Sequence, residues 1–377
     1  MRKTVLGLIG TGGISQSQHL PNLMRAPHVY LKTVCDKNEE LLARMREKYR
    51  VPNATAEVDD LLADPEIEGV VVATREDMQA KLTIRALAAG KHVYVEKPLA
   101  ATVEECEEVV EAQRRAGKFV VVGFNRRQAP SYLRARELLN ADGGAQNIYY
   151  RISDEYWRWG KGNPPGVRVI HEVCHIFDVL RWIVGSEVVS IYCACSRPDD
   201  EIYTMKFASG CVATILNSGY ATRDFPKERF EAISQRGSVT VEEFVELRAF
   251  GYPGVAPMQR FAGHTHPDRE FAHKHIFSTL GAEGLYAFRR MGWEYLHQQE
   301  NGGESGCGAE IETYMNEHAP HWNYMVDKGW LGLIDHFAQC IQENRLPEAA
   351  SARDGFVASQ LCHAAIKSRE TGEVVRL

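Results

Sequence analysis

The sequence has no block of basic residues and no long apolar segment. Its 377 residues carry a formal net charge of −6, which argues against nucleic acid as the main partner, because phosphate binding requires clustered Lys and Arg. No run approaches the roughly 20 apolar residues that a membrane-spanning helix needs. The apolar run after Arg2 and Lys3 is too short and too rich in glycine for a signal peptide. These absences predict no membrane and no nucleic-acid partner.

The nine cysteines lack the regular spacing of a disulfide framework. The only close pair is Cys193-x-Cys195, and the scattered arrangement is typical of free thiols in a cytoplasmic protein. The chain also lacks internal repeats and low-complexity linkers, and its apolar fraction of 44% is normal for a globular protein. The length fits two domains, which we place at residues 1–125 and 126–377.

A glycine-rich turn follows the first apolar strand, residues 5–9. The turn reads Gly10-Thr11-Gly12-Gly13-Ile14-Ser15, with Ser15 where a third small residue is expected. The first glycine permits a tight turn, the second lets the backbone approach a pyrophosphate, and the third position must be small so that helix and strand can pack. The following helix would offer its free N–H groups to the phosphates. This pattern predicts a dinucleotide site.

The second strand, residues 30–35, ends in Asp36, where an acid is expected to bind the ribose 2′-hydroxyl. A carboxylate would repel a 2′-phosphate, so Asp36 favours NAD over NADP, although the neighbouring Lys37 leaves NADP open. Strands at 69–74, 92–95 and 119–123 then alternate with helices at 39–49, 78–89 and 102–116, the last with a Thr102–Glu105 capping box. This alternation predicts an α/β fold with a doubly wound parallel sheet.

The strand at 92–95 ends in Glu96-Lys97-Pro98. Ligands of open α/β sheets bind at the carboxyl ends of the strands. Lys97 is therefore a candidate for chemistry, whereas a lone Glu-Lys pair elsewhere would be a solvated surface pair.

The second half of the chain has an α+β pattern with a mainly antiparallel meander. Expected helices are 131–140, 172–184, 328–343 and 353–371, and expected strands are 145–154, 188–195, 202–207, 211–218, 229–234 and 238–241. Residues 253–328 fit no strand pattern and are expected to be a mostly helical insertion. Three interpretations of this insertion stay open: a metal site, a lid over the substrate cleft, or a surface or oligomer-interface role. The metal site would use four of its histidines, His264, His266, His273 and His275.

Residues 171–178 contain H-E-x-x-H, which is the signature of a zinc metalloprotease helix. That interpretation would need a third ligand and a different fold, and we expect no metal. His171, His175 and Asp178 recur at i, i+4 and i+7, so they share one helix face. A shared face allows them to serve one site.

Several of these segments together resemble the glucose-fructose oxidoreductase, inositol dehydrogenase and rhizopine-catabolism (Gfo/Idh/MocA) family. They are the glycine turn, Asp36, Ala73-Thr74, residues 90–99 and Gly123-Phe124-Asn125-Arg126-Arg127. The resemblance is close up to residue 125 and continues with gaps to the C-terminus. It implies an N-terminal Rossmann domain with bound NAD, and a C-terminal domain with a large open sheet through which members form homodimers or homotetramers.

The resemblance also implies site residues. Lys97 would be hydrogen-bonded to the substrate hydroxyl, and His175 would share its proton. His171 stands where many members have aspartate, while residues 172–175 match the Glu-Val-Cys-His of a subgroup; His171 is the third catalytic candidate. The expected cofactor-binding residues are Gly10, Gly12, Gly13, Ile14, Ser15, Asp36, Lys37, Thr74, Glu96, Lys97 and Asn125. The expected substrate-binding residues are Lys97, Arg126, Tyr156, Trp157, Arg158, Lys161, His171, Glu172 and His175.

The expected activity is NAD-dependent oxidation of a secondary hydroxyl of a sugar, sugar acid or polyol. Trp157 offers a ring for stacking on a sugar, with core packing as the alternative, and Arg158, Lys161 and Arg168 would select an anionic sugar. Two other functions stay open. One is an NAD-dependent glycoside hydrolase that works by transient oxidation, elimination, water addition and re-reduction. The other is a sugar sensor that binds NAD without turnover.

Overall fold

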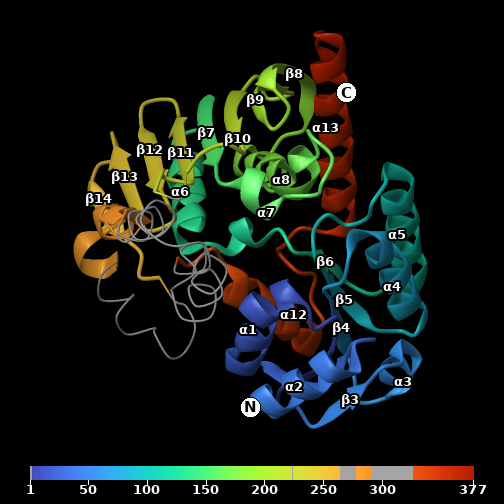
Figure 1. Cartoon of the computed structure of the whole chain (residues 1–377). Helices are drawn as coiled ribbons and strands as arrows, with labels where there is room; N and C mark the ends of the chain where they lie inside the picture. Colours follow the sequence, from blue (N-terminus) through green and yellow to red (C-terminus); the bar gives the residue numbers. More distant parts are fainter. Residues whose placement is uncertain (1, 223, 264–276, 288, 291–325) are drawn as a thin grey trace, which may run out of the picture. The chain divides into compact units, whose positions relative to one another are not determined.

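The computed structural model describes residues 2–222, 224–263, 277–287, 289–290 and 326–377 (Figure 1). The chain divides into two compact units. Unit 1 comprises Met1–Gln128, Phe177–Val179 and Gly329–His363, and unit 2 comprises Ala129–Ile176, Leu180–Lys328 and Ala364–Leu377. The sequence assigns all of 126–377 to one domain, whereas in the structure Gly329–His363 groups with the N-terminal residues.

Unit 1 contains a six-stranded parallel sheet in the order β3-β2-β1-β4-β5-β6. This is the doubly wound Rossmann order, in which the chain reverses direction across the sheet beside β1. The strands are β1 (Thr4–Ile9), β2 (Val29–Cys35), β3 (Asn53–Thr55), β4 (Gly69–Val72), β5 (His92–Val95) and β6 (Val120–Val122). The predicted parallel sheet is thus confirmed, and the short β3 is an addition to it.

Helices cover this sheet from both sides. α1 (Leu20–Arg25) and α12 (Trp330–Glu343) lie beside each other, and α4 (Glu76–Ala88) and α5 (Val103–Ala116) pair on the other side of the sheet (Figure 1). α2 (Glu39–Tyr49) and α3 (Val58–Ala63) also belong to this unit. Buried side chains of α12, among them Leu333 and Phe337, belong to the same apolar cluster as Leu6 and Leu8 of β1. The C-terminal segment therefore supplies part of the Rossmann core.

Unit 2 is built on a nine-stranded, mainly antiparallel sheet in the order β14-β13-β12-β11-β7-β10-β9-β8-β15. The strands are β7 (Asn147–Ser153), β8 (Val188–Arg197), β9 (Asp200–Phe207), β10 (Val212–Ser218), β11 (Glu228–Ile233), β12 (Ser238–Glu242), β13 (Glu246–Phe250), β14 (Met258–Arg260) and β15 (Val375–Arg376). The predicted meander is wrong at one point, because β7 lies between β10 and β11 and pairs in parallel with β10.

Three short strands were not predicted. β13 follows β12 directly, β14 lies inside the expected helical insertion, and β15 pairs with β8 where a tail was expected. Most of the insertion, including the four histidines from His264 to His275, lies outside the described residues. Among the described residues, the helices of unit 2 include α6 (Pro130–Ala141), the single-turn α7 (Tyr156–Trp159), and parts of α8 (Cys174–Val184) and α13 (Ala352–Thr371). Residues 277–280 and 282–287 are also helical.

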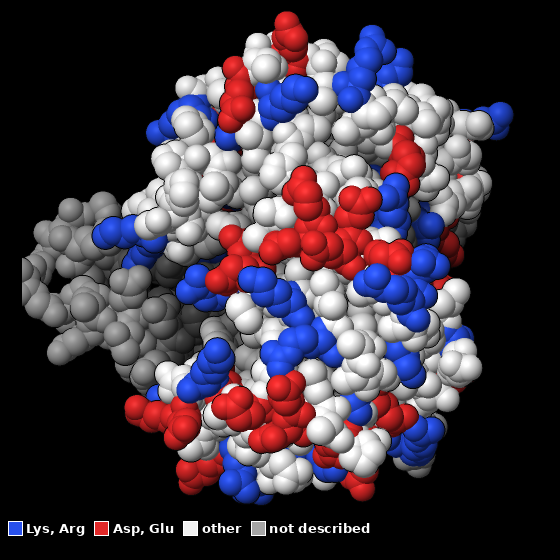
Figure 2. Space-filling view, turned by 90° about the vertical axis from the view of Figure 1, so that its right-hand side faces the viewer, with Lys and Arg blue, Asp and Glu red and all other residues white. Residues whose placement is uncertain are grey.

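The surface carries charges of both signs. On the face that Figure 2 shows, Lys and Arg alternate with Asp and Glu, and the described residues form no continuous basic area there. Within the described residues, we find no helix with the length and apolar character that crossing a membrane requires.

Candidate functional site

Five strand ends of unit 1 meet at one edge of the parallel sheet. Cys35, Ile9, Val72, Val95 and Val122 are neighbours in register. The residues that follow them extend the ladder by one hydrogen bond each: Gly10 N–H to Cys35, Ala73 N–H to Ile9, Glu96 N–H to Val72 and Gly123 N–H to Val95. The glycine turn, Asp36, Thr74, Lys97 and Asn125 are thereby brought together at the edge where ligands of this fold bind.

The glycine turn has the features that a close-lying phosphate needs. Gly10 has a φ of +95°, and a Cβ there would lie 2.3 Å from the carbonyl oxygen of Ala73, so no other residue fits. A Cβ on Gly12 or Gly13 would meet nothing within 4 Å, which leaves their backbone open to a ligand. The Ser15 hydroxyl donates to the carbonyl oxygen of Gly10 at 2.6 Å and closes the turn.

Asp36 is held at the end of β2 by the turn itself. Its Oδ2 accepts hydrogen bonds from the Thr11 N–H at 2.7 Å and the Thr11 hydroxyl at 2.9 Å, and Oδ1 accepts from the Asn38 N–H at 2.9 Å. Thr11 was not predicted, although its position between two glycines is a signal that could have identified it. A fixed, partly exposed carboxylate beside an open glycine backbone fits the ribose and pyrophosphate of NAD. Lys37 is exposed next to it.

Glu96 is buried beneath the strand ends and does not lie at the surface. Its Oε2 accepts from the Lys97 N–H at 3.2 Å. Its Oε1 lies 2.9 Å from Nε2 of the wholly buried His19, although the ring is not aligned for a straight hydrogen bond. A Cβ on Gly123 would come within 2.8 Å of Oε1. Glu96 therefore shapes the backbone that presents Lys97. His19 was missed, since nothing in its own helix pointed to β5.

The segment after β6 is buried rather than open. Asn125 and Arg126 are almost fully buried. Arg127 forms a bidentate ion pair with Asp178, at 2.9 and 2.6 Å, and also contacts Asp354 at 3.0 Å. Burial works against the charge on Asp354, but Arg127 and the hydrogen bonds from Ser351 outweigh it, so the pKa of this carboxyl lies below its usual value. Asp178, which was predicted to share a helix face with His171 and His175, is thus paired with Arg127 within unit 1.

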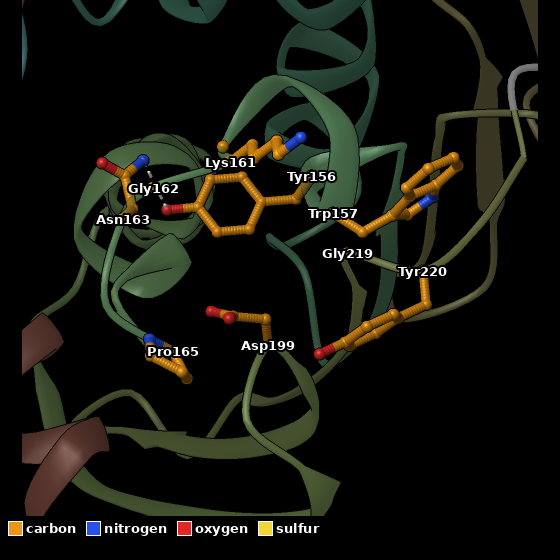
Figure 3. A pocket seen from close by; sticks show the side chains of 10 residues that line it. Tyr156, Trp157, Lys161, Gly162, Asn163, Pro165, Asp199, Gly219 and Tyr220 are labelled. Carbon is orange, nitrogen blue, oxygen red and sulfur yellow. Dashed lines mark hydrogen bonds between the residues drawn. The ribbon is translucent and has the colours of Figure 1, made fainter.

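Unit 2 has a pocket of about 170 Å³ after β7 (Figure 3). Its lining comes from residues 156–165 together with Asp199, Gly219 and Tyr220. The Trp157 side chain is 50% exposed, and the Tyr220 ring is covered on one face by the Arg197 guanidinium at 3.4 Å from its centroid. Asp199 accepts from the Gly166 and Arg168 N–H groups, so it holds the loop in place. The structure brings the predicted Tyr156, Trp157 and Lys161 together around this pocket.

The Tyr156 hydroxyl connects the pocket to His171. Nδ2 of Asn163 donates to the Tyr156 oxygen at 3.1 Å, and the same oxygen lies 3.1 Å from Nδ1 of His171. His171 lies in a π-helical stretch, Val169–Val173, that precedes α8, and it is partly buried. His175, in the first turn of α8, is almost fully buried.

A cluster of three buried charges and the partly buried Asp154 includes Glu172, which is next to His171 in sequence. Nζ of Lys227 is 2.7 Å from Asp154 and 2.8 Å from Glu172, and Arg168 donates to Asp154 at 3.1 and 3.3 Å. Burial disfavours the ammonium form of Lys227, but the two carboxylates outweigh it and raise its pKa. Arg168 is wholly buried, so the expectation that it selects an anionic substrate is wrong. Glu172 is bound by Lys227, which no sequence signal indicated.

Within the H-E-x-x-H segment, His171 contacts the Tyr156 hydroxyl and Glu172 is paired with Lys227. Among the described residues, no three His, Cys, Asp or Glu side chains are grouped so that they could hold a metal ion.

Comparison with known families gives two matches. Residues 5–124 match the family model described as "Oxidoreductase family, NAD-binding Rossmann fold". Residues 142–240 match the "GFO/IDH/MocA C-terminal domain". The two matches cover both the parallel sheet and most strands of the second sheet.

Individual relatives agree with these matches. The chain is 27% identical over 261 residues to an uncharacterized oxidoreductase, YrbE, of Bacillus subtilis, covering 64% of this chain and 74% of the relative. It is 26% identical over 259 residues to the myo-inositol 2-dehydrogenase of Thermotoga maritima, covering 64% and 76%. The scyllo-inositol dehydrogenase of Lactobacillus casei, solved with NAD(H) and scyllo-inositol, superposes with a TM-score of 0.72 at 16% identity, covering 100% and 99%. That structural likeness shows the shared fold.

Proposed function

Because the chain belongs to the Gfo/Idh/MocA oxidoreductase family, we propose that it is an NAD-dependent dehydrogenase of a sugar, sugar acid or polyol. The observation that carries the proposal is the convergence of the glycine turn, Asp36 and Lys97 at one sheet edge. Bound NAD would supply the hydride acceptor for the substrate carbon. The residues that would hold it are the open glycines of the turn and Asp36.

The chain's own residues would bind and orient the alcohol and handle its proton. Lys97 is the group that hydrogen-bonds the reacting hydroxyl, held at the end of β5 through the Glu96 carboxylate. His175 shares the proton, since histidine exchanges protons near neutral pH. His171 contacts a substrate oxygen.

Two observations support the proposed substrate class. Curated relatives include inositol dehydrogenases, whose substrates are cyclic polyols. The pocket of unit 2 combines the exposed Trp157 ring with polar groups and the exposed Lys161. Aromatic faces pack on sugar C–H surfaces, and an ammonium binds a carboxylate. We infer that a sugar acid or polyol occupies this pocket, with Lys161 of its lining as the selecting cation. Arg158, close to the lining residues in sequence, is a second candidate for this role.

The proposal is tested with a panel of sugars, sugar acids, polyols and aryl glycosides. NADH absorbance and aglycone release are followed in parallel. NADH formation supports the dehydrogenase. Aglycone release without net NADH would show the hydrolase instead, and NAD and sugar binding without either signal would show a sensor.

Lys97→Met should lower turnover by about 100-fold or more, the usual scale for losing a proton-handling group. Lys81→Met, at an exposed lysine of α4 in the same unit, is the matched control and should keep full activity. Full activity of Lys97→Met would remove Lys97 from the reaction.

We further propose a homodimer or homotetramer formed through the large sheet of unit 2. Its strands alternate buried and exposed side chains, and Ile202 and Tyr192 are 47% and 38% exposed on the uncovered face. Exposed apolar side chains on a sheet face favour a protein partner. A cytoplasmic location is proposed from the cysteines, since those in the described residues are free thiols.

A further inference from the structure

The side chains of Asn163, Tyr156 and His171 form a continuous polar chain within unit 2. Figure 3 shows the amide of Asn163 directed at the Tyr156 hydroxyl. The hydroxyl oxygen is 3.1 Å from each of its two nitrogen neighbours, Nδ2 of Asn163 and Nδ1 of His171. Tyr156 is almost fully buried, so water competes poorly for these hydrogen bonds.

One placement of the protons gives each of the three groups a hydrogen bond. An amide nitrogen can only donate, so the Tyr156 oxygen accepts from Asn163. The hydroxyl then has its single proton left to give, and Nδ1 of His171 lies within reach of it. A ring nitrogen that accepts a hydrogen bond carries no proton, so the proton of the neutral ring lies on Nε2.

We propose that Tyr156 is a positioning residue that fixes His171 as its Nε2–H tautomer. The inference rests on the proposed function, in which His171 contacts a substrate oxygen. An aspartate at this position would offer only acceptors, whereas His171 held in this tautomer offers an N–H donor. The site of this chain would then bind the substrate oxygen through its lone pair, and proton removal falls to Lys97 and His175.

The tautomer is measured directly by NMR on the full-length protein labelled with ¹⁵N-histidine. The His171 signals are assigned from their loss in His171→Asn. The expected result is a protonated-type shift at Nε2 and an unprotonated-type shift at Nδ1. A proton on Nδ1 in the unmodified protein would overturn the inference.

Two substitutions make the test selective. Tyr156→Phe removes the hydroxyl and should give a mixture of both tautomers. Asn163→Asp replaces the donor with an acceptor, so the Tyr156 proton should turn towards it and the His171 proton should move to Nδ1. Tyr220→Phe, at another tyrosine of the pocket lining, is the control and should leave the tautomer unchanged. An unchanged tautomer in both Tyr156→Phe and Asn163→Asp would refute the role of Tyr156.

Kinetics then separate this inference from the proposed function. With a substrate found in the panel, Tyr156→Phe should lower kcat by about tenfold, the scale of one hydrogen bond to a reacting group, with NAD affinity unchanged. An unchanged kcat would overturn the functional part of the inference. Absence of NADH formation with every substrate would refute the dehydrogenase proposal, while the NMR result would still decide the tautomer.

Discussion

Ion pairs of buried charged residues hold several side chains of unit 2 in place. Lys227 lies between Asp154 and Glu172, with Arg168 on the far side of Asp154. Removing one member of such a group leaves an unpaired buried charge, which costs more than the pair contributes. The chain spacing of these residues gives no hint of the cluster, because charge pairs so far apart in sequence meet only through β7 and β11.

Lys227→Met should therefore destabilise the protein strongly. The expected loss is about 3–5 kcal/mol in the free energy of unfolding, because Asp154 and Glu172 lose their shared cation. Urea unfolding followed by circular dichroism measures it. Lys161→Met, at an exposed lysine, is the matched control and should change stability by at most about 0.5 kcal/mol. Equal effects of the two variants would contradict the assigned role.

Asp36 is the residue at which cofactor choice is tested. Asp36→Ala removes the carboxylate that Thr11 holds at the end of β2. NAD affinity should fall by about tenfold, the scale of a hydrogen bond to a charged group, whereas NADP should lose less or gain, since its 2′-phosphate is no longer repelled. Titration calorimetry with both nucleotides measures this. Asp59→Ala, at an exposed position of α3, is the control and should bind both nucleotides as before. An equal loss for both nucleotides in Asp36→Ala would refute the assignment.

At the scale of elements, the sequence correctly predicted the features that depend on interactions within one segment, such as helix caps and buried strands. The Thr102 side chain caps α5 by accepting from the Glu105 N–H, as its sequence indicates, and buried runs such as Val70–Val72 form strands of a parallel sheet. Pairing between distant strands could not be predicted. The parallel pairing of β7 with β10 depends on contacts across more than sixty residues of chain. β15 has only two residues and carries no periodic signal, and β13, with the sequence ELRAF, has no β-branched residue that would indicate a strand.

His92, at the start of β5, makes the stability of this element pH-dependent. Its Nδ1 accepts from the Phe119 N–H at 3.0 Å, and burial lowers its pKa from 6.5 to about 4. Between these values the unfolded chain binds a proton that the folded chain does not. Stability should therefore fall as the pH drops from about 6.5 towards 4.

The measurement is the unfolding temperature across that pH range. His92→Asn keeps an acceptor but cannot be protonated, so its unfolding temperature should fall less over the same range. A parallel decline of both proteins would show that other groups cause the acid sensitivity.

At the scale of the molecule, the chain is more interleaved than two consecutive domains. α12 returns to unit 1 and packs Leu333 and Phe337 into the Rossmann core. Its apolar face predicted a helix, but sequence spacing carries no information on which sheet a distant helix covers. The residues of the candidate site likewise differ in whether the sequence could predict them. Gly10, Asp36 and Lys97 were predictable because they lie at the carboxyl ends of β1, β2 and β5. His19 and Lys227, in contrast, act through partners that only folding brings near.

Assembly through the sheet of unit 2 provides the test at this largest scale. Ile202 faces the uncovered side of β9, beside Leu216 of β10 and Ala194 of β8. Ile202→Asp would put a charge into the centre of the proposed interface, where one unfavourable residue weakens association by about tenfold or more. Light scattering after size-exclusion chromatography, over a series of protein concentrations, should show a shift to smaller species. Leu346→Asp changes an apolar residue that is 78% exposed in unit 1 and should leave the assembly intact. A monomeric unmodified protein, or an Ile202→Asp variant that assembles as before, would mean that this sheet face has no second copy of the chain as its partner.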